Sequence, residues 1–248
     1  MKTLINFAHR GASAYCPENT MAAYTKALEL HATGIETDVQ LTKDERIVTI
    51  HDESLKRTTG VDRMVKDTDY EELRHLDAGS WKAPEFSSER VPLLEDLLEL
   101  IRPTDVVLNI ELKNTYVRYP GLEQKCIQLI RDMKLSEQIV FSSFNHYSLA
   151  LCKQLAPEIR TGILYSEGLY RPWDYAKTLR ADALHAYHPA VLPEFVEEAK
   201  QYNVVYHPWT VNDPKRMEEL VDAGAAGIIT DYPDRLHEIL KKKGIVAG

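Results

Sequence analysis

The stretch GIETDVQLTKDERIVTIHD, residues 34–52, indicates both the fold class and the place of a polar site. Residues 35–39 alternate in character as in a β-strand, so Glu36 and Asp38 share one face of that strand. The polar turn that follows, TKDER, is too short for a crossover helix. We therefore predict that residues 47–51 return antiparallel to the strand as a hairpin arm.

Outward from this stretch, β-rich runs alternate with segments of helical period, a pattern typical of a parallel sheet covered by helices. Eight such pairs in 248 residues predict an α/β protein with a closed (β/α)8 TIM barrel, and an open doubly wound sheet is the alternative. The predicted strands are 4–8, 35–39, 106–113, 139–143, 161–165, 183–185, 204–209 and 227–230. The predicted helices are 20–30, 93–101, 122–133, 146–155, 173–179, 194–202, 214–223 and 234–242.

The prediction for domain organisation is a single barrel domain over residues 1–248, because single α/β barrels routinely reach this length. Residues 53–91 are rich in charged and turn residues and lack a clear strand or helix period. We expect them to form a small insertion after the second strand, lying over the barrel mouth. The hairpin arm that precedes them would bring His51 toward the same mouth.

The composition excludes several classes of protein. The net charge of -8 argues against a nucleic-acid surface, because phosphate backbones bind clustered Lys and Arg. No apolar run approaches the roughly 20 residues of a membrane span, and the N-terminal apolar run ends early, at His9, so we expect a cytoplasmic protein. Three cysteines without metal-type spacing argue against a disulfide framework. Cys126 and Cys152 lie on apolar helix faces and are predicted core residues, Cys16 is a loop residue, and the oligomeric state stays open.

Acidic side chains are predicted to point into the barrel, because the outward face of each strand packs on helices. Residues 106–113, VVLNIELK, repeat the alternation and place Glu111 and Lys113 on the inward face with Asn109. Glu36, Asp38 and Glu111 would then converge, which is unfavourable unless protons or a cation compensate their charge. A hard divalent cation, Mg²⁺ or Ca²⁺, suits a site made of oxygens.

The alternative is that these acids form ion pairs with Arg10 or Lys113 and serve only the structure. A guanidinium clamps two oxygens of a phosphate, and an ammonium acts as a point charge. A metal together with these two cations points to a phosphoryl centre. Asn19 or Thr20 is predicted to cap the first helix, whose N-terminus would also favour an anion.

Two histidines flank the predicted acid cluster, His9 at the tip of the first strand and His51 on the hairpin arm. A pair of imidazoles can serve as general base and general acid near neutral pH. We interpret the other histidines as structural, although His185 and His188 lie near a strand end and could border the pocket. Asp52 either caps the hairpin arm or orients the His51 ring.

Taken together, these residues resemble the glycerophosphodiester phosphodiesterase family. The resemblance runs through nearly the whole chain, and the order of its segments at successive strand tips makes it specific. The matching segments are HRG (9–11) with ENT (18–20), ETD (36–38), IHD (50–52), ELK (111–113), SSF (142–144), WTVN (209–212) and TDYP (230–233).

The resemblance implies a barrel with an insertion after the second strand and a hydrolase of glycerol and lipid metabolism. Its substrate would be a small glycerophosphodiester, cleaved with a divalent metal to glycerol 3-phosphate and an alcohol. By matching position, Glu36, Asp38 and Glu111 would bind the metal. His9 and His51 would be the acid and base, and the assignment of each role stays open.

The resemblance also implies that Arg10 and Lys113 hold the phosphate. Phe144 and Trp209 form a wall for glycerol or the leaving group, or else belong to the core. The nucleophile is either water or the neighbouring glycerol hydroxyl, and the preferred head group cannot be inferred from the sequence. Two other functions stay open: glycoside hydrolysis by paired acids, which leaves the cations and histidines unused, and binding of a glycerophosphate-like ligand without turnover.

Overall fold

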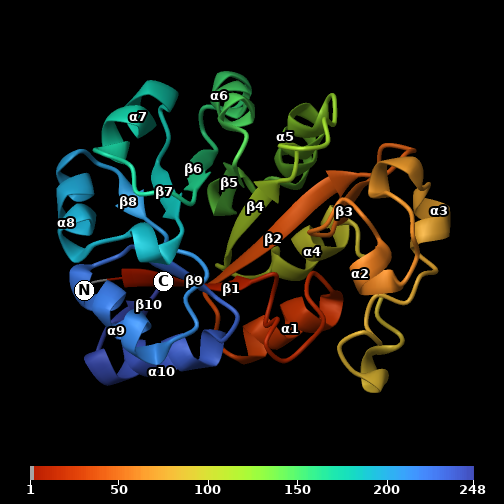
Figure 1. Ribbon diagram of the computed structural model, residues 1–248, viewed down its shortest axis with the longest axis horizontal. Helices are drawn as coiled ribbons and strands as arrows, with labels where there is room; N and C mark the ends of the chain where they lie inside the picture. The colour runs from red at the N-terminus through yellow and green to blue at the C-terminus, as the bar shows by residue number, and fades with distance from the viewer. Residues whose placement is uncertain (1–2) are drawn as a thin grey trace.

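The computed structural model describes residues 3–248. Within this range eight parallel strands form a barrel in chain order, with β1 paired to both β2 and β9, so the predicted (β/α)8 barrel is confirmed and the open sheet is wrong (Figure 1). The barrel strands are β1 (Thr3–His9), β2 (Gly34–Leu41), β4 (Val107–Leu112), β5 (Ile139–Ser143), β6 (Arg160–Tyr165), β7 (Ala183–Ala186), β8 (Val205–Tyr206) and β9 (Gly227–Thr230).

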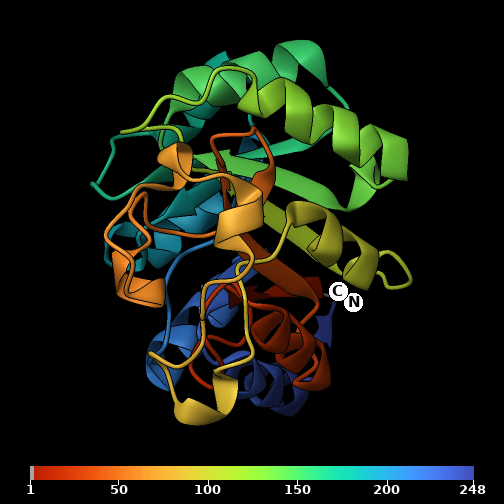
Figure 2. The same cartoon turned by 90° about the vertical axis from the view of Figure 1, so that its right-hand side faces the viewer.

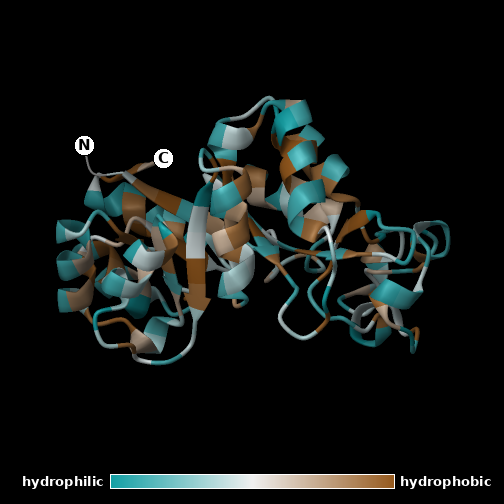
Figure 3. Ribbon diagram, turned by 90° about the horizontal axis from the view of Figure 1, so that it is seen from above, coloured by the Kyte–Doolittle hydropathy of each residue, from teal (hydrophilic) through white to brown (hydrophobic). Residues whose placement is uncertain are grey.

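Helices surround the barrel and bury one face against it. In α4, for example, Leu94, Leu97, Leu98 and Ile101 are buried, at the spacing of one helix face. Hydrophobic and hydrophilic residues alternate along these helices, as expected for amphipathic helices (Figure 3). The covering helices are α1 (Met21–Glu29), α4 (Leu94–Ile101), α5 (Leu122–Met133), α6 (His146–Leu155), α7 (Pro172–Leu179), α8 (Pro193–Gln201), α9 (Pro214–Ala223) and α10 (Pro233–Lys243).

Two strands differ from the prediction. The strand expected over 204–209 has only two residues in β8, although His207 N and Trp209 N still donate to the carbonyls of Leu184 and Ala186 at 2.9 and 3.0 Å. Separate backbone bonds, such as Ile229 N to the Pro208 carbonyl at 2.9 Å, join this segment to β9. A further strand that was not predicted, β10 (Val246–Ala247), pairs with the start of β1 at the opposite end of the barrel from the polar residues.

The predicted hairpin is confirmed. β3 (Ile47–Thr49) runs antiparallel to β2, with Val39 opposite Thr49. Beyond β3, the buried Gln40 amide nitrogen lies 2.9–3.0 Å from the carbonyl oxygens of residues 50, 51 and 52. The hydroxyl of Tyr119 donates to the oxygen of the same amide at 2.7 Å. Gln40 therefore ties the segment that carries His51 to the barrel.

Residues 53–91 contain only short helices, in agreement with the weak periodicity of their sequence: α2 (Lys56–Thr59), η1 (Val65–Asp67), α3 (Tyr70–Leu73) and η2 (Pro84–Phe86). Their apolar side chains form a second small core with the hairpin: Val48, Ile50, Leu55, Val65, Leu73, Ala78 and Val91. The segment lies where β2 points, in front of the barrel in Figure 2.

The predicted core cysteines Cys126 and Cys152 are buried, and Cys16 is buried as well. Thr20 is the residue that caps α1, since its hydroxyl accepts from the backbone N–H of Ala23. Among residues 3–248, no helix combines the length and the apolar character needed to cross a membrane.

Candidate active site

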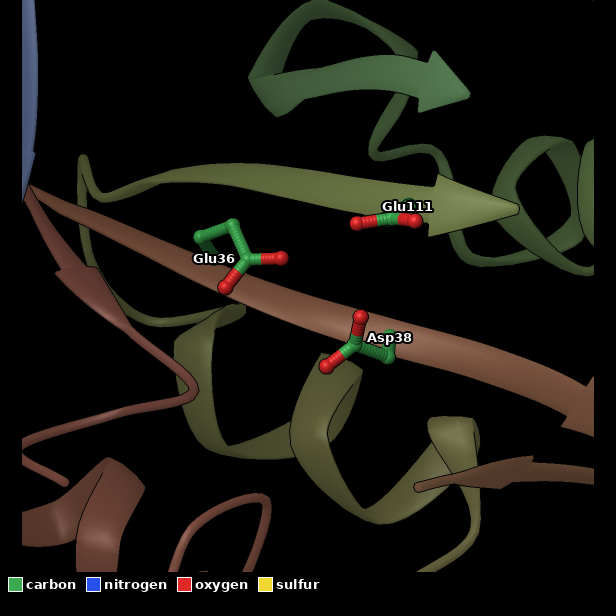
Figure 4. A group of neighbouring side chains, drawn as sticks. All are labelled: Glu36, Asp38 and Glu111. Carbon is green, nitrogen blue, oxygen red and sulfur yellow. The ribbon is translucent and has the colours of Figure 1, made fainter. Parts of the chain in front are cut away.

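Three acidic side chains meet between β2 and β4. Asp38 pairs with Glu111 in the strand register, and residues paired in this way point to the same face of the sheet. Glu36 lies one inward step earlier on β2 and pairs with His9 of β1. One carboxylate oxygen from each acid lies within 4.8 Å of the other two (Figure 4). The structure thus brings together the three residues predicted as metal ligands.

Burial of this cluster opposes full ionisation. Burial, reinforced by the charges of Asp38 and Glu111, raises the pKa of Glu36 well above its usual value. Burial also raises the pKa of Glu111 to about 7, although Lys113 acts in the opposite direction. Burial alone would raise the pKa of Asp38, but Arg10 and other nearby cations hold it well below its usual value.

The cluster suits a divalent cation on the chemistry of its donors. All three side chains offer carboxylate oxygens, the ligands preferred by Mg²⁺ and Ca²⁺. Asp38 Oδ1 is buried and has no hydrogen-bond partner among the described residues. The amide of Asn19 donates to the other oxygen of Asp38 at 2.9 Å and fixes that carboxylate in place. Glu36, Asp38 and Glu111 therefore fit a cation.

Two cations lie against the acids. Arg10 Nε is 3.3 Å from Asp38 Oδ2, and Lys113 Nζ is 2.9 Å from Glu111 Oε1 and 3.8 Å from Asp38 Oδ1. Burial would lower the pKa of Lys113, but the charges of Glu111 and Asp38 raise it above its usual value. The ion pairs expected in the structural alternative are thus present.

The turn after β1 explains why arginine is followed by glycine. Gly11 has a φ of +79°, and a Cβ at this position would lie 2.6 Å from the backbone carbon of Ala23. Only glycine lets the chain pass so close to α1. Arg10 is also left-handed, with a φ of +54°, and its backbone N–H donates to Glu36 at 3.0 Å.

His9 is held by a carboxylate from the far end of the chain. Its Nδ1 lies 2.7 Å from Asp231 Oδ1, and its Nε2 lies 3.9 Å from Glu36 Oε2. Asp231 also accepts hydrogen bonds from Ser13 Oγ at 2.9 Å and from the amide of Asn212 at 2.6 Å. Burial would raise the pKa of Asp231, but the bonds from His9 and Asn212 lower it to about 2.

His51 has a similar partner. Its Nδ1 lies 2.7 Å from Asp52 Oδ1, and Arg57 Nε donates to Asp52 Oδ2 at 2.6 Å. Burial would raise the pKa of Asp52, but the bonds from Arg57 and His51 lower it to about 2. Asp52 thus contacts the imidazole, as it must if it orients the His51 ring. Burial lowers the pKa of His51, with the charge of Asp38 opposing.

A chain of ion pairs connects the two loops that carry the histidines. Glu18 accepts from Arg10 Nη1 at 2.8 Å and from both terminal nitrogens of Arg57 at 2.7 and 2.8 Å. Sequence reasoning assigned no role to Glu18, Arg57 or Asp231. Glu18 lies in the segment ENT and Asp231 in the segment TDYP, so the resemblance to the family could have indicated both. Arg57 lies in the insertion, outside every matching segment.

A single cavity of about 190 Å³ collects most of the predicted site residues. Those that line it are His9, Arg10, Glu36, His51, Glu111, Lys113, Phe144 and Trp209. The two aromatic rings meet edge to face at 5.7 Å. The lining of this cavity includes neither His185, which is buried in the barrel, nor His188.

The chain is similar to known proteins over nearly its whole length. The profile of the Glycerophosphoryl diester phosphodiesterase family matches residues 9–235. A glycerophosphodiester phosphodiesterase from Caldanaerobacter subterraneus subsp. tengcongensis is 46% identical, over 98% of this chain and 100% of the relative. One from Bacillus subtilis is 34% identical, over 96% of this chain and 87% of the relative.

Solved structures show the same similarity. An Oleispira antarctica phosphodiesterase in complex with the product sn-glycerol-3-phosphate has a TM-score of 0.88 and 30% identity, with 97% of each chain covered. A glycerophosphodiester phosphodiesterase from Agrobacterium tumefaciens has a TM-score of 0.83 and 26% identity, with 96% of this chain and 100% of the other covered.

Proposed function

The chain belongs to the glycerophosphoryl diester phosphodiesterase family, and from that premise we propose that it cleaves glycerophosphodiesters to sn-glycerol 3-phosphate and an alcohol with a divalent cation and two catalytic histidines. As a member of this family it is a phosphoric diester hydrolase. The observation that carries the finer proposal is the convergence of three carboxylate oxygens within 4.8 Å, beside two imidazoles that each contact a carboxylate.

Glu36, Asp38 and Glu111 would hold the cation, either Mg²⁺ or Ca²⁺. When bound, such an ion offsets the repulsion between the carboxylates and withdraws charge from the oxygens of the phosphate. Arg10 and Lys113, which now contact the acids, would bind the remaining phosphate oxygens. A guanidinium and an ammonium directed at a phosphate stabilise the negative charge that its oxygens gain in the transition state.

His9 and His51 would move the protons. Because Nδ1 of each ring is bonded to an aspartate, Nε2 is the nitrogen available to the substrate. One neutral imidazole takes the proton of the attacking hydroxyl at Nε2, and the other ring, as an imidazolium, gives a proton to the departing alkoxide. The attacking group is water or the neighbouring glycerol hydroxyl. Only the second route forms a cyclic glycerophosphate, which water then opens, so detection of this intermediate in a rapidly quenched single turnover distinguishes the two.

The test is release of glycerol 3-phosphate from a panel of diesters, with a chelator and with each metal restored. Glu111→Gln should require a higher concentration of Mg²⁺ or Ca²⁺ for half-maximal activity. Glu99→Gln, an exposed position on the outer surface of α4, is the matched control and should behave as wild type. Full turnover of every diester in excess chelator would contradict the proposed metal dependence.

A further inference from the structure

The lining of the active-site cavity includes two buried polar atoms that lack partners among the described residues. Asn109 and Ser142 both line this cavity, and the two residues are 1% and 0% exposed. Across residues 3–248, no hydrogen-bond partner lies in reach of Asn109 Oδ1 or Ser142 Oγ. Buried polar atoms form hydrogen bonds in the large majority of cases. Two such atoms without a partner in the same cavity therefore indicate that polar groups of a ligand bind there.

The strand register places these two residues beside the acid cluster. Ser142 of β5 pairs with Glu111, so it lies at the level of that carboxylate. Asn109 of β4 pairs with Glu36, so it lies at the level of the acid nearest the start of β2. The lining of the cavity also includes the apolar side chains of Leu164 and Ile229. A ligand group that lies beside the acids therefore meets two polar atoms together with apolar side chains.

Two buried histidines orient the Asn109 amide from the side that faces away from the cavity. Its amide nitrogen lies 3.5 Å from His185 Nδ1, and His185 Nε2 lies 3.0 Å from His207 Nδ1. Burial lowers the pKa of both rings, that of His207 to about 3, so both are neutral. A neutral ring that accepts at one nitrogen donates at the other. His185 thus accepts from Asn109 and donates to His207, which leaves Asn109 Oδ1 as an acceptor toward the cavity.

The barrel makes room for this arrangement at one glycine. A Cβ at Gly162, on β6, would lie 2.2 Å from His185 Nε2. Any larger residue would therefore displace the ring that orients Asn109.

We propose that Asn109 and Ser142 bind the diol of the glycerol arm of the diester, in particular its terminal hydroxyl, and so select glycerol over other alcohols. This inference rests on the proposed function. A hydroxyl donates one hydrogen bond and accepts others, so it can satisfy the acceptor Oδ1 and the hydroxyl Oγ together. A quaternary ammonium can donate to neither atom and would leave both unpaired.

The other arm of the diester would occupy a second cavity. A second cavity of about 420 Å³ shares His51, Glu111, Lys113 and Phe144 with the first. It lies between the loops that follow β4 and β6, where Tyr116 and Glu167 are exposed. The first cavity, at about 190 Å³, is smaller than the roughly 300 Å³ at which pockets for drug-sized ligands begin, so it suits the small glycerol arm.

The test compares two substrates that differ in one hydroxyl. Glycerophosphocholine has the whole diol, whereas 2-hydroxypropyl phosphocholine lacks only the terminal hydroxyl and keeps the one that could attack the phosphate. We expect wild type to favour glycerophosphocholine in kcat/KM by about tenfold, the size of one or two neutral hydrogen bonds. Ser142→Ala and Asn109→Leu should each lower this ratio toward one.

Thr161→Val is the matched control. Thr161 Oγ1 is also buried and without a partner in the described part of the chain, but this residue is not part of the cavity lining. Its loss should leave the ratio unchanged. A wild-type ratio near one, or an unchanged ratio in both Ser142→Ala and Asn109→Leu, would overturn the inference while the proposed function stands.

Calorimetry provides a readout that does not depend on turnover. Wild type should bind sn-glycerol 3-phosphate about tenfold more tightly than 2-hydroxypropyl phosphate, and Ser142→Ala should reduce the difference. If wild type cleaves no glycerophosphodiester, the proposed function fails. The binding preference for the diol then decides the inference on its own: its presence supports the selection of glycerol, and equal affinities overturn it.

Discussion

Replacement of Asp231 by asparagine tests whether the activity depends on the orientation of His9. Asn212 presents its NH₂ group to Asp231 Oδ2, because its own Oδ1 already accepts from Thr230 Oγ1 and from the backbone N–H of Asp231. The new amide must therefore turn its oxygen to Asn212 and its nitrogen to His9. His9 Nδ1 would then have to accept, which puts the ring proton on Nε2, the nitrogen at which a base must accept one. If His9 is instead the acid, its imidazolium would direct a second proton, on Nδ1, at the new NH₂ group.

The expected loss is large because proton transfer by a positioned imidazole contributes about 10²- to 10⁴-fold to the rate. We expect kcat for glycerophosphocholine to fall by a factor in this range in Asp231→Asn, with little change in KM, since the phosphate-binding residues stay in place.

The same substitution should also lower stability. The pKa of Asp231 falls from 3.8 to about 2 in the folded chain, which corresponds to about 2 kcal/mol. Because the folded pKa is the lower one, this stabilisation is present above pH 4 and is lost as the pH falls toward 2. The free energy of unfolding, measured in urea, should differ less between pH 7 and pH 3 in Asp231→Asn than in wild type.

Ser13→Ala is the control for this prediction. Ser13 Oγ donates to the same Oδ1 of Asp231 but does not touch His9 in the hydrogen-bond network of residues 3–248. Its loss should change kcat by no more than a few-fold, since the carboxylate stays. A kcat within threefold of wild type in Asp231→Asn itself would refute the reasoning that His9 acts through this aspartate.

Three further predictions concern other parts of the molecule. His51→Ala should abolish turnover of glycerophosphocholine but leave binding of glycerol 3-phosphate within a few-fold in calorimetry; substantial turnover would remove His51 from the mechanism. Arg57→Gln removes the bonds to Glu18 and Asp52 and should lower kcat by about tenfold, a typical loss for a group that supports a catalytic residue, whereas Lys56→Gln, an exposed neighbour, should not. Burial holds the pKa of His207 at about 3, so its contribution to stability is present above pH 6.5 and is lost as the pH falls toward 3. In His207→Asn, the free energy of unfolding in urea should therefore change less between pH 6.5 and pH 3 than in wild type. An equal change in both would contradict the low pKa of His207.

The alternation of side chains along β2 and β4 was enough to predict the acid cluster. Glu36, Asp38 and Glu111 lie on the inward face because a strand turns every second residue to the same side. The number and order of strand and helix segments likewise predicted the barrel. The organisation of residues 1–248 as one domain stays a prediction, as does each catalytic role.

Local chemistry also explains where the boundaries were misplaced. Pro208 has no N–H to donate toward β9, although backbone bonds from His207 and Trp209 to the neighbouring strand continue. Proline at the first position begins α7, α8 and α10 one residue earlier than predicted. These helix starts follow from the backbone chemistry of proline, which hydropathy does not register.

The sequence by itself determined which residue types share a face, because the geometry of the strand and the helix repeats along the backbone. Only the tertiary structure decided their partners. Asp231 reaches His9 across 222 residues because the barrel closes β9 against β1, and Glu18 meets Arg57 because the insertion folds back over the first loop. Such pairs depend on closure of the whole barrel and on packing of the insertion, and no local spacing in the chain encodes either one.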